Sequence, residues 1–371
     1  MRRPENPDYG GLPFLAPHRC DRFSVKRRRG RAPVASLDER RNREDIMLTR
    51  RRMLSHIGAA GAASLTLEAG IGLAAAPSTV KTPVDFDVPR GACDCHVHIF
   101  DPVHFPYFSG RLYSPPEASI DDLRSLQSAL HLDRVVVVTP SVYGIDNSCT
   151  LNAVRELGAR ARGVAVIDKS VSAAMLDEMA GAGVRGVRLN LETAGESDPA
   201  AAKRILGATA AQLSGRNWHI QINTHLAVIT ALKSDIMGLP MPVIFDHFGG
   251  AKAAPGPSQP GFVDLLDLVK SGHAYVKISA AYRASDKTPD FPDTAPLAQA
   301  LVAANPDRVV WGSNWPHPGR GPTPTALAPP YPNDDGRVLN LLPTWVPDPA
   351  LRKKILVDNP ARLYGFPPIA G

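Results

Sequence analysis

The sequence predicts an α/β protein built as a (β/α)8 TIM barrel, and three observations support this prediction. Short apolar runs rich in β-branched residues alternate with amphipathic helical stretches from residue 91 onward. Their apolar residues do not alternate with polar ones but form continuous stretches, which is typical of parallel strands buried on both faces. The expected barrel, residues 77–371, is long enough for such a fold, which takes about 250 residues plus loops.

Each β-then-α unit is identified in order along the chain. The expected strands are 93–98, 134–139, 163–167, 185–191, 219–223, 243–247, 274–279 and 308–313. The expected helices include 120–130, 173–182, 200–213, 262–270 and 295–304. An open, doubly wound sheet is the alternative, but no Gly-rich phosphate-binding turn follows any expected strand. The Pro-rich stretch 316–332 is expected to be an active-site loop rather than a linker.

The positive charge of the chain is concentrated at its N-terminus. Residues 1–52 carry 15 Lys and Arg against 7 Asp and Glu, whereas the rest carries 27 against 29. A nearly neutral body argues against an electrostatic groove for nucleic acid. The 4 cysteines are too few and too scattered for a disulfide framework.

Two N-terminal segments are expected to precede the barrel. Residues 1–46 are rich in Arg and Pro and are predicted to be disordered or not translated, with Met47 as the true start. Residues 47–76 resemble a twin-arginine signal peptide, because Arg50 and Arg51 precede an Ala- and Gly-rich stretch. An ordinary helix with chance arginines is the alternative. Glu68 and the small residues make this stretch a poor membrane span. The signal predicts a partner, the twin-arginine translocase, and a periplasmic or secreted protein.

Polar residues gather where the expected strands end. His96 and His98 lie two residues apart on one strand, so both side chains point the same way, into the barrel mouth. Other strand ends carry polar residues, namely Ser141, Arg188, Asn190, Asp246, His247, Lys277, Ser279, Tyr282, Arg283, Asn314 and His317. Barrel enzymes keep their chemistry at this carboxyl face, so the sequence predicts an active site there.

Several segments in a fixed order resemble the amidohydrolase-related barrel hydrolases (amidohydrolase family 2). The most similar branch is that of 2-pyrone-4,6-dicarboxylate lactonase. The similarity runs from residue 91 to residue 366, and its segments are 91–98, 246–249, 311–318 and 359–365.

The resemblance implies a site for a carboxylated lactone or a related acid. His96, His98 and His247 match histidines that polarise the lactone carbonyl. Tyr113, Ser141, Arg188 and Arg283 match positions that bind substrate carboxylates. Arg suits this role because its planar guanidinium binds a carboxylate through two hydrogen bonds. His317 is either a loop residue at the substrate or a substitute base.

Two positions depart from the family pattern. The family has an aspartate at the end of the eighth strand as general base, and this chain has Asn314. An amide can orient a water molecule but cannot take its proton. A second arginine of the dicarboxylate lactonase, six residues beyond Arg188, is replaced by Ala194. One contact to a substrate carboxylate is therefore missing.

The ligand set for a metal is incomplete in the sequence. Binuclear relatives need a bridging residue after the fourth strand, where this chain has Asn190, and the aspartate replaced by Asn314. His96, His98 and His247 could hold a mononuclear Zn²⁺. The lactonase branch works without metal, and the expectation is no metal.

Three classes of function follow. The first is a hydrolase that opens a lactone ring by water attack, with His247 or His317 as the base in place of Asn314. The second is a catalytically impaired periplasmic protein that binds an anion in the same pocket. The third is a metal-dependent decarboxylase or amidohydrolase on the same barrel.

Overall fold

The computed structural model describes residues 80–368, and they fold into a barrel of eight parallel strands. The strands are β1 (Cys93–Val97), β2 (Arg134–Val138), β3 (Ala161–Ala165), β4 (Val184–Leu189), β5 (His219–Ile222), β6 (Val243–Phe245), β7 (Ala274–Ser279) and β8 (Val309–Gly312). Each strand pairs with the next along the chain. Backbone hydrogen bonds of 2.9 Å from Asn314 to His96 and from His98 to Trp315 join the two ends of the sheet. The predicted (β/α)8 barrel is confirmed.

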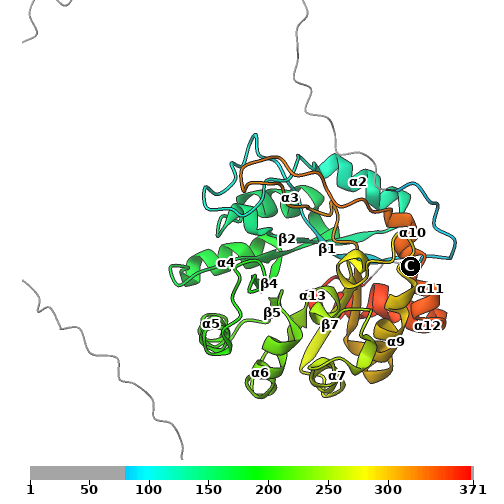
Figure 1. The fold of residues 1–371 in the computed structure, drawn as a ribbon. Coiled ribbons are helices and arrows are strands. Elements are labelled where there is room, and N and C mark those ends of the chain that lie inside the picture. The colour runs from blue at the N-terminus through cyan, green and yellow to red at the C-terminus, as the bar shows by residue number, and fades with distance from the viewer. Residues whose placement is uncertain (1–79, 369–371) are drawn as a thin grey trace, which may run out of the picture. The chain divides into compact units, whose positions relative to one another are not determined.

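Helices surround the strands (Figure 1). The longer ones are α2 (Ile120–Ala129), α3 (Ser148–Leu157), α4 (Ala173–Ala182), α5 (Pro199–Gln212), α6 (Leu226–Met237), α7 (Phe262–Lys270) and α9 (Ala295–Ala304). Shorter ones are α8 (Ala281–Ala284), α10 (Asp335–Leu339), α11 (Leu342–Trp345), α12 (Pro349–Lys353) and α13 (Asn359–Tyr364). The expected helices 173–182, 262–270 and 295–304 agree with α4, α7 and α9. The helices α3 and α6 were not predicted.

Local sequence explains where helices begin. Ser119 caps α2 by accepting a hydrogen bond from the backbone of Asp122, whose carboxylate in turn accepts one from the backbone of Ser119. Asp198 caps α5 by accepting hydrogen bonds from the backbone N–H groups of Ala200 and Ala201, ahead of Pro199 at the first position of the helix. Helix α6 is apolar on several faces, so it lacks the one-sided pattern that reveals an amphipathic helix.

The two ends of the barrel differ in chemistry. At the amino ends of the strands, Tyr364 and Phe366 pack with Cys93 and Cys95 in an apolar cluster. Cys93, Cys95 and Cys149 are free, buried thiols. The predicted segments 1–46 and 47–76 lie outside the described residues. Within residues 80–368, no helix is long and apolar enough to cross a membrane.

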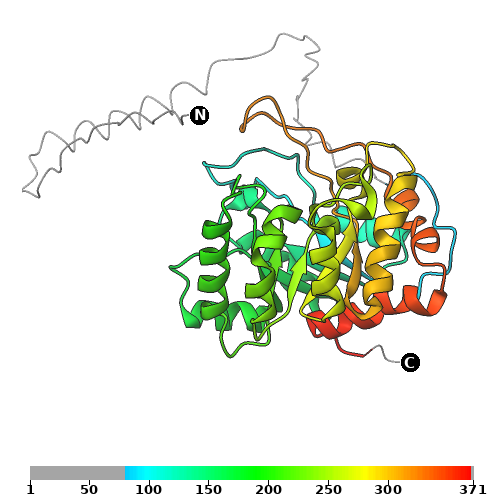
Figure 2. The same ribbon diagram turned by 60° about the horizontal axis from the view of Figure 1, so that its bottom comes forward.

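The loop 316–332 packs on the carboxyl ends of the strands. Ala328 N donates to Ser114 O over 2.8 Å, and Ser114 Oγ donates to Pro324 O over 2.8 Å. Tyr331 N donates to His317 O over 2.8 Å, so the two arms of the loop are tied together. Figure 2 shows this orange loop beside the cyan segment that follows β1, at the end opposite the red helix α13. The loop therefore belongs to the barrel and is not a linker.

Candidate active site

Three histidine rings pack together at the carboxyl end of the barrel. The ring of His96 lies with its centroid 5.0 Å from that of His98 and 4.8 Å from that of His247. All three residues are at most 5% exposed. His98 Nδ1 lies 2.7 Å from the carbonyl oxygen of Val138, and His247 Nδ1 lies 2.9 Å from Ser279 Oγ. The structure thus brings together the three histidines that the sequence singled out.

These imidazoles are neutral at physiological pH. Burial lowers the pKa of His96 to about 3, and the nearby positive charge of Lys277 adds to this effect. Burial likewise lowers the pKa of His98 and of His247 well below the usual range. A neutral imidazole has one N–H donor and one lone pair, so each ring offers both a donor and an acceptor.

Below the histidines lies a buried set of charges that we call the Asp246 network: Asp246, Lys277, Arg188, Gln221 and His96. Asp246 Oδ2 accepts from Arg188 Nε at 3.0 Å and from Gln221 Nε2 at 3.1 Å. Asp246 Oδ1 lies 3.4 Å from Lys277 Nζ and 3.2 Å from His96 Nδ1. Burial works to raise the pKa of Asp246, but His96, Lys277 and Arg188 hold it well below its usual range.

Asp246, Lys277 and Gln221 were not expected to have a role in the site. Asp246 and Lys277 were visible only as polar residues at strand ends, and Gln221 lies inside the apolar strand β5. Their partners come from different strands, up to 181 residues apart along the chain. A charged residue in an otherwise apolar strand is the signal that could have found them, because such residues are almost never buried unpaired.

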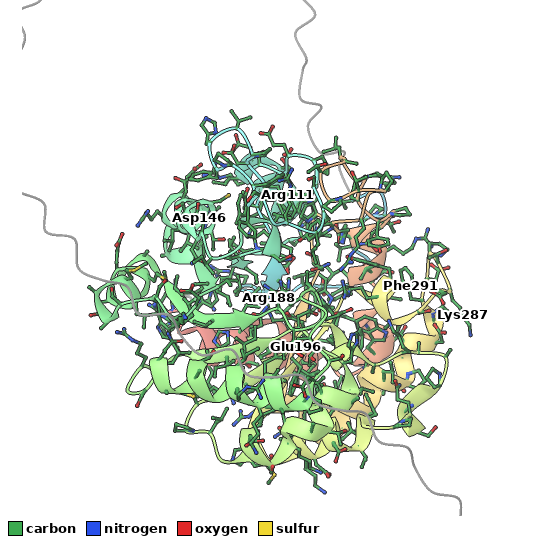
Figure 3. All side chains as sticks on the ribbon, turned by 60° about the vertical axis from the view of Figure 1, so that its left-hand side comes forward. Arg111, Asp146, Arg188, Glu196, Lys287 and Phe291 are labelled. Carbon is green, nitrogen blue, oxygen red and sulfur yellow. The ribbon has the colours of Figure 1, made fainter. Side chains whose placement is uncertain are left out.

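Both arginines predicted to bind substrate carboxylates already contact an acidic side chain. Arg188 is paired with Asp246 and is only 6% exposed. Figure 3 shows Arg188 near the middle of the view, with Asp146 and Lys287 nearer the edge of the barrel. Arg283 Nη2 lies 2.7 Å from Glu192 Oε2, in a half-buried pair. Their predicted contact with substrate stays a prediction.

Tyr113 marks the place where several predicted residues converge. Ser141 and the charges of Arg188, Arg320 and Arg283 all act on the pKa of its phenol. Burial raises the pKa of Tyr113, while Ser141 and the three guanidinium groups partly offset that rise. Arg320 lies in the loop 316–332, is exposed, and makes no hydrogen bond or ion pair within the described part of the chain. The sequence analysis did not single out Arg320.

Asn314 follows β8 and lies beside the histidines of β1. Its backbone N–H donates to His96 O, and its φ of 66° is in the left-handed region, which asparagine tolerates well. Asn314 Nδ2 donates to the Tyr282 hydroxyl over 2.6 Å. Asn314 Oδ1 is buried and has no hydrogen-bond partner.

His317 is separated from this group. His317 Nε2 lies 3.0 Å from Asp335 Oδ2 and 3.2 Å from Asn333 Nδ2, and the ring packs edge-on against Tyr282 at 5.5 Å. The residue is fully buried. This placement gives His317 a structural contact with helix α10 and the end of the loop 316–332, and its predicted contact with substrate stays a prediction.

The candidate metal ligands are His96, Asp246 and His247, whose donor atoms lie within 4.8 Å of one another. Asp246 therefore replaces His98 of the predicted set. The group fits a divalent cation poorly, because Lys277 and Arg188 already place two positive charges against its one carboxylate. Asn314 adds no negative charge where binuclear relatives have an aspartate.

A (β/α)8 barrel with histidines and guanidinium groups at its carboxyl mouth has the layout of a barrel enzyme, whose active site lies at that face. Residues 93–366 match the amidohydrolase family, and the chain belongs to that family. The protein is accordingly an enzyme, a hydrolase with a lactone-hydrolase-like function.

Curated relatives and solved structures support this assignment. The chain is 38% identical over 304 residues to 4-sulfomuconolactone hydrolase of Rhizobium radiobacter, covering 80% of this chain and 98% of the relative. It is 34% identical over 297 residues to 2-pyrone-4,6-dicarboxylate hydrolase of Comamonas testosteroni, covering 75% and 92%. A crystal structure from Pseudomonas putida, described as a 2-pyrone-4,6-dicarboxylic acid hydrolase, has a TM-score of 0.62 at 30% identity and covers 76% and 100%.

Proposed function

We propose that the protein opens the ring of an anionic lactone by attack of water on the ring carbonyl. The observation that carries the proposal is the packing of three neutral imidazoles beneath a mouth that holds guanidinium groups. The relatives support it, because the names of both describe ring esters that carry sulfonate or carboxylate groups.

In the proposed reaction, water oxygen bonds to the carbonyl carbon and the ring C–O bond breaks. His98 is the base in this proposal, because its Nδ1–H is committed to the Val138 carbonyl and its Nε2 therefore carries a lone pair. Asn314 Oδ1, buried and without a partner, is suited to accept a hydrogen bond from the attacking water. His96 and His247 stabilise the negative charge that develops on the carbonyl oxygen. The proton taken from water passes to the leaving ring oxygen.

The anionic substituent is proposed to bind near Tyr113 and Ser141. Arg188 and Arg283 each already contact a carboxylate, that of Asp246 and that of Glu192, whereas Arg320 has no acidic partner among the described residues. We therefore assign Arg320 as the free cation that compensates for Ala194, where the dicarboxylate lactonase pattern has an arginine. A guanidinium carried by the loop 316–332 suits a sulfonate or a carboxylate, because it binds either through two hydrogen bonds.

The reaction as proposed needs no metal, and it takes place after export. The poor fit of the Asp246 network to a divalent cation supports the first point. The twin-arginine pattern around Arg50 and Arg51 supports export to the periplasm or beyond. A protein that only captures the anion is the second candidate, favoured by the amide of Asn314 in place of a carboxylate base.

A panel of lactones separates these functions. Ring opening releases an acid, so turnover is followed by pH change, with and without a chelator, on sulfonated, carboxylated and neutral lactones. Turnover of an anionic lactone that survives the chelator supports the proposal. Binding without turnover identifies an anion-binding protein, and activity lost with the chelator identifies a metal-dependent hydrolase or decarboxylase.

A further inference from the structure

Lys277 is a fully buried lysine in the middle of β7, with no role in the chemistry proposed above. Lysine is almost never fully buried unless it is paired. Its Nζ lies 2.7 Å from Gln221 Oε1, 3.1 Å from His96 Nδ1 and 3.4 Å from Asp246 Oδ1. The ammonium group thus donates hydrogen bonds to acceptors on β5 and β1, and it forms an ion pair with Asp246, which follows β6.

The two contacts of the Gln221 amide agree with an ammonium group on Lys277. Its Nε2 donates to Asp246 Oδ2 at 3.1 Å, while its Oε1 accepts from Lys277. An ammonium group can only donate, so the orientation of the amide follows from its two neighbours. The same reasoning then applies to the third contact, the ring of His96.

We infer that Lys277 is a positioning residue that keeps the His96 proton on Nε2 and prevents a divalent cation from binding beside Asp246. Because the ammonium group donates, His96 Nδ1 accepts with its lone pair, and the single proton of the neutral ring lies on Nε2. Asp246 Oδ1 is 3.2 Å from the same Nδ1, but it makes no hydrogen bond with it. A proton on Nδ1 would therefore have no aligned acceptor.

The consequence is that His96 and His98, which lie two residues apart, have different roles at the substrate. His96 presents an N–H group from a buried Nε2 that has no partner in the structure, ready for a carbonyl oxygen. His98 has the opposite tautomer, because its Nδ1–H faces the carbonyl of Val138. The inference rests on the proposed function for its use, since one ring donates to the lactone and the other accepts from water.

The same contacts disfavour a metal ion. A metal ligand must offer a lone pair, and the lone pair of His96 is taken by the ammonium group on Nδ1. Asp246, the only carboxylate in the candidate ligand group, already faces Lys277 and Arg188. A second cation at this place would be repelled by both.

The proton position is measured directly, without substrate, by NMR of the full protein carrying ¹⁵N-labelled histidine. Long-range ¹⁵N–¹H correlations distinguish a protonated Nε2 from a protonated Nδ1, and a His96→Asn variant assigns the signals. We expect His96 to be the Nε2–H form and His98 the Nδ1–H form. A His96 ring protonated on Nδ1 overturns the inference.

Zinc binding provides the second measurement, with Zn²⁺ alone titrated against a chromogenic chelator. The wild type should bind it weakly, and Lys277→Met should bind it at least 10- to 100-fold more tightly, a range typical of changes next to metal ligands. Lys270→Met, an exposed lysine of α7, is the matched control and should behave as the wild type. Tight, stoichiometric Zn²⁺ binding by the wild type, or no gain in a folded Lys277→Met, overturns the inference. Where Lys277→Met does not fold, the wild-type tautomer and zinc titration decide.

Neither measurement depends on turnover, so the inference and the proposed function fail separately. If the protein proves to be an anion-binding protein, the His96 tautomer and the zinc result stand unchanged. Once a lactone substrate is identified, Lys277→Met should lower kcat at least tenfold with little change in KM, because Lys277 touches only groups beneath the substrate.

Discussion

Asn314 donates its amide N–H to the hydroxyl oxygen of Tyr282 over 2.6 Å, and this contact decides what its other atom can do. The amide oxygen is left buried, next to β1 and without a partner. It can accept a hydrogen bond from water but cannot remove a proton. The amide therefore acts as a fixed acceptor in the place where relatives have a base.

Replacing Asn314 with aspartate tests this arrangement. Asn314→Asp keeps the volume and lets the Tyr282 hydroxyl donate to the new carboxylate. General-base catalysis contributes typically 10²–10⁴-fold, so kcat should rise on a lactone that the wild type opens slowly. The new rate should fall on the acid side as the carboxylate is protonated. A lower kcat/KM on every accepted lactone would show that Asn314 donates to the substrate and that the added charge repels it.

His98 is the proposed base, and His98→Asn separates its two nitrogens. The asparagine amide can still donate to the Val138 carbonyl, as Nδ1 does now at 2.7 Å, but it has no basic nitrogen. We expect kcat to fall by about 10²–10⁴-fold with a melting temperature close to that of the wild type. The matched variant is His317→Asn, whose effect on kcat should be much smaller. A large loss in His317→Asn with a small one in His98→Asn would assign the base to His317.

The anion-binding role of Arg320 is tested with Arg320→Met. A lost hydrogen bond to a charged group costs about 1.5–3 kcal/mol, so KM for an acidic lactone should rise roughly tenfold or more. A neutral lactone should be affected far less. Arg283→Met is the informative comparison, because Arg283 is already paired with Glu192 at 2.7 Å and should change KM less than Arg320 does. A larger rise in KM for Arg283→Met than for Arg320→Met would indicate that Arg283 binds the substrate carboxylate, as the sequence predicted.

Much of the barrel could be predicted from the sequence, because the strands are buried on both faces and read as continuous apolar runs. Strand β7 and helices α4, α7 and α9 have the expected bounds. Helix α6 was not predicted from the sequence, because its apolar residues are not confined to one side of the helix. Several strands end one or two residues earlier than expected, at the point where polar side chains begin. His98, for example, was expected at the end of the first strand and instead follows β1.

The sequence predicted which residues gather at the site, but it did not predict which side chains contact one another. His96, His98 and His247 come together because parallel strands end at one face. The pairing of Arg283 with Glu192 could not be predicted, because it joins residues 91 apart, one in the short helix α8 and one in the loop after β4. Lys277 lies in a strand that reads as apolar, and its partners depend on the register of the barrel. Arg320 reaches Tyr113 only through the path of the loop 316–332.

Export is tested by replacing Arg50 and Arg51 together with lysine. Twin-arginine signals depend on the arginine pair, so the variant should remain in the cytoplasm while the wild type reaches the periplasm. Cell fractionation with an antibody against the barrel measures the distribution. Replacing the exposed Arg160 and Arg204 of the barrel by lysine is the control, because these residues lie outside the proposed signal. Unchanged export of the Arg50 and Arg51 variant would remove the signal interpretation.

The stability of the barrel should depend on pH through His219, which lies far from the proposed chemistry. His219 begins β5, packs edge-on against Tyr364 at 5.1 Å, and has two buried ring nitrogens without partners. Burial, with the Lys277 charge adding to it, lowers the pKa of His219 from 6.5 to about 3. Between these values the unfolded chain binds a proton that the folded protein excludes.

Stability must therefore be fully present above pH 6.5 and be lost as the pH falls toward 3. The slope is about 1.4 kcal/mol per pH unit for one such group, once the pH is well below the unfolded pKa. Urea unfolding of His219→Leu at pH 5.0–7.0 should show a stability profile that is flatter by about this amount. His225→Leu, an exposed histidine that caps α6 without a side-chain hydrogen bond, should keep the wild-type slope. Equal slopes in wild type and His219→Leu would mean that His219 binds its proton in the folded protein, and would require a partner for its ring within the barrel.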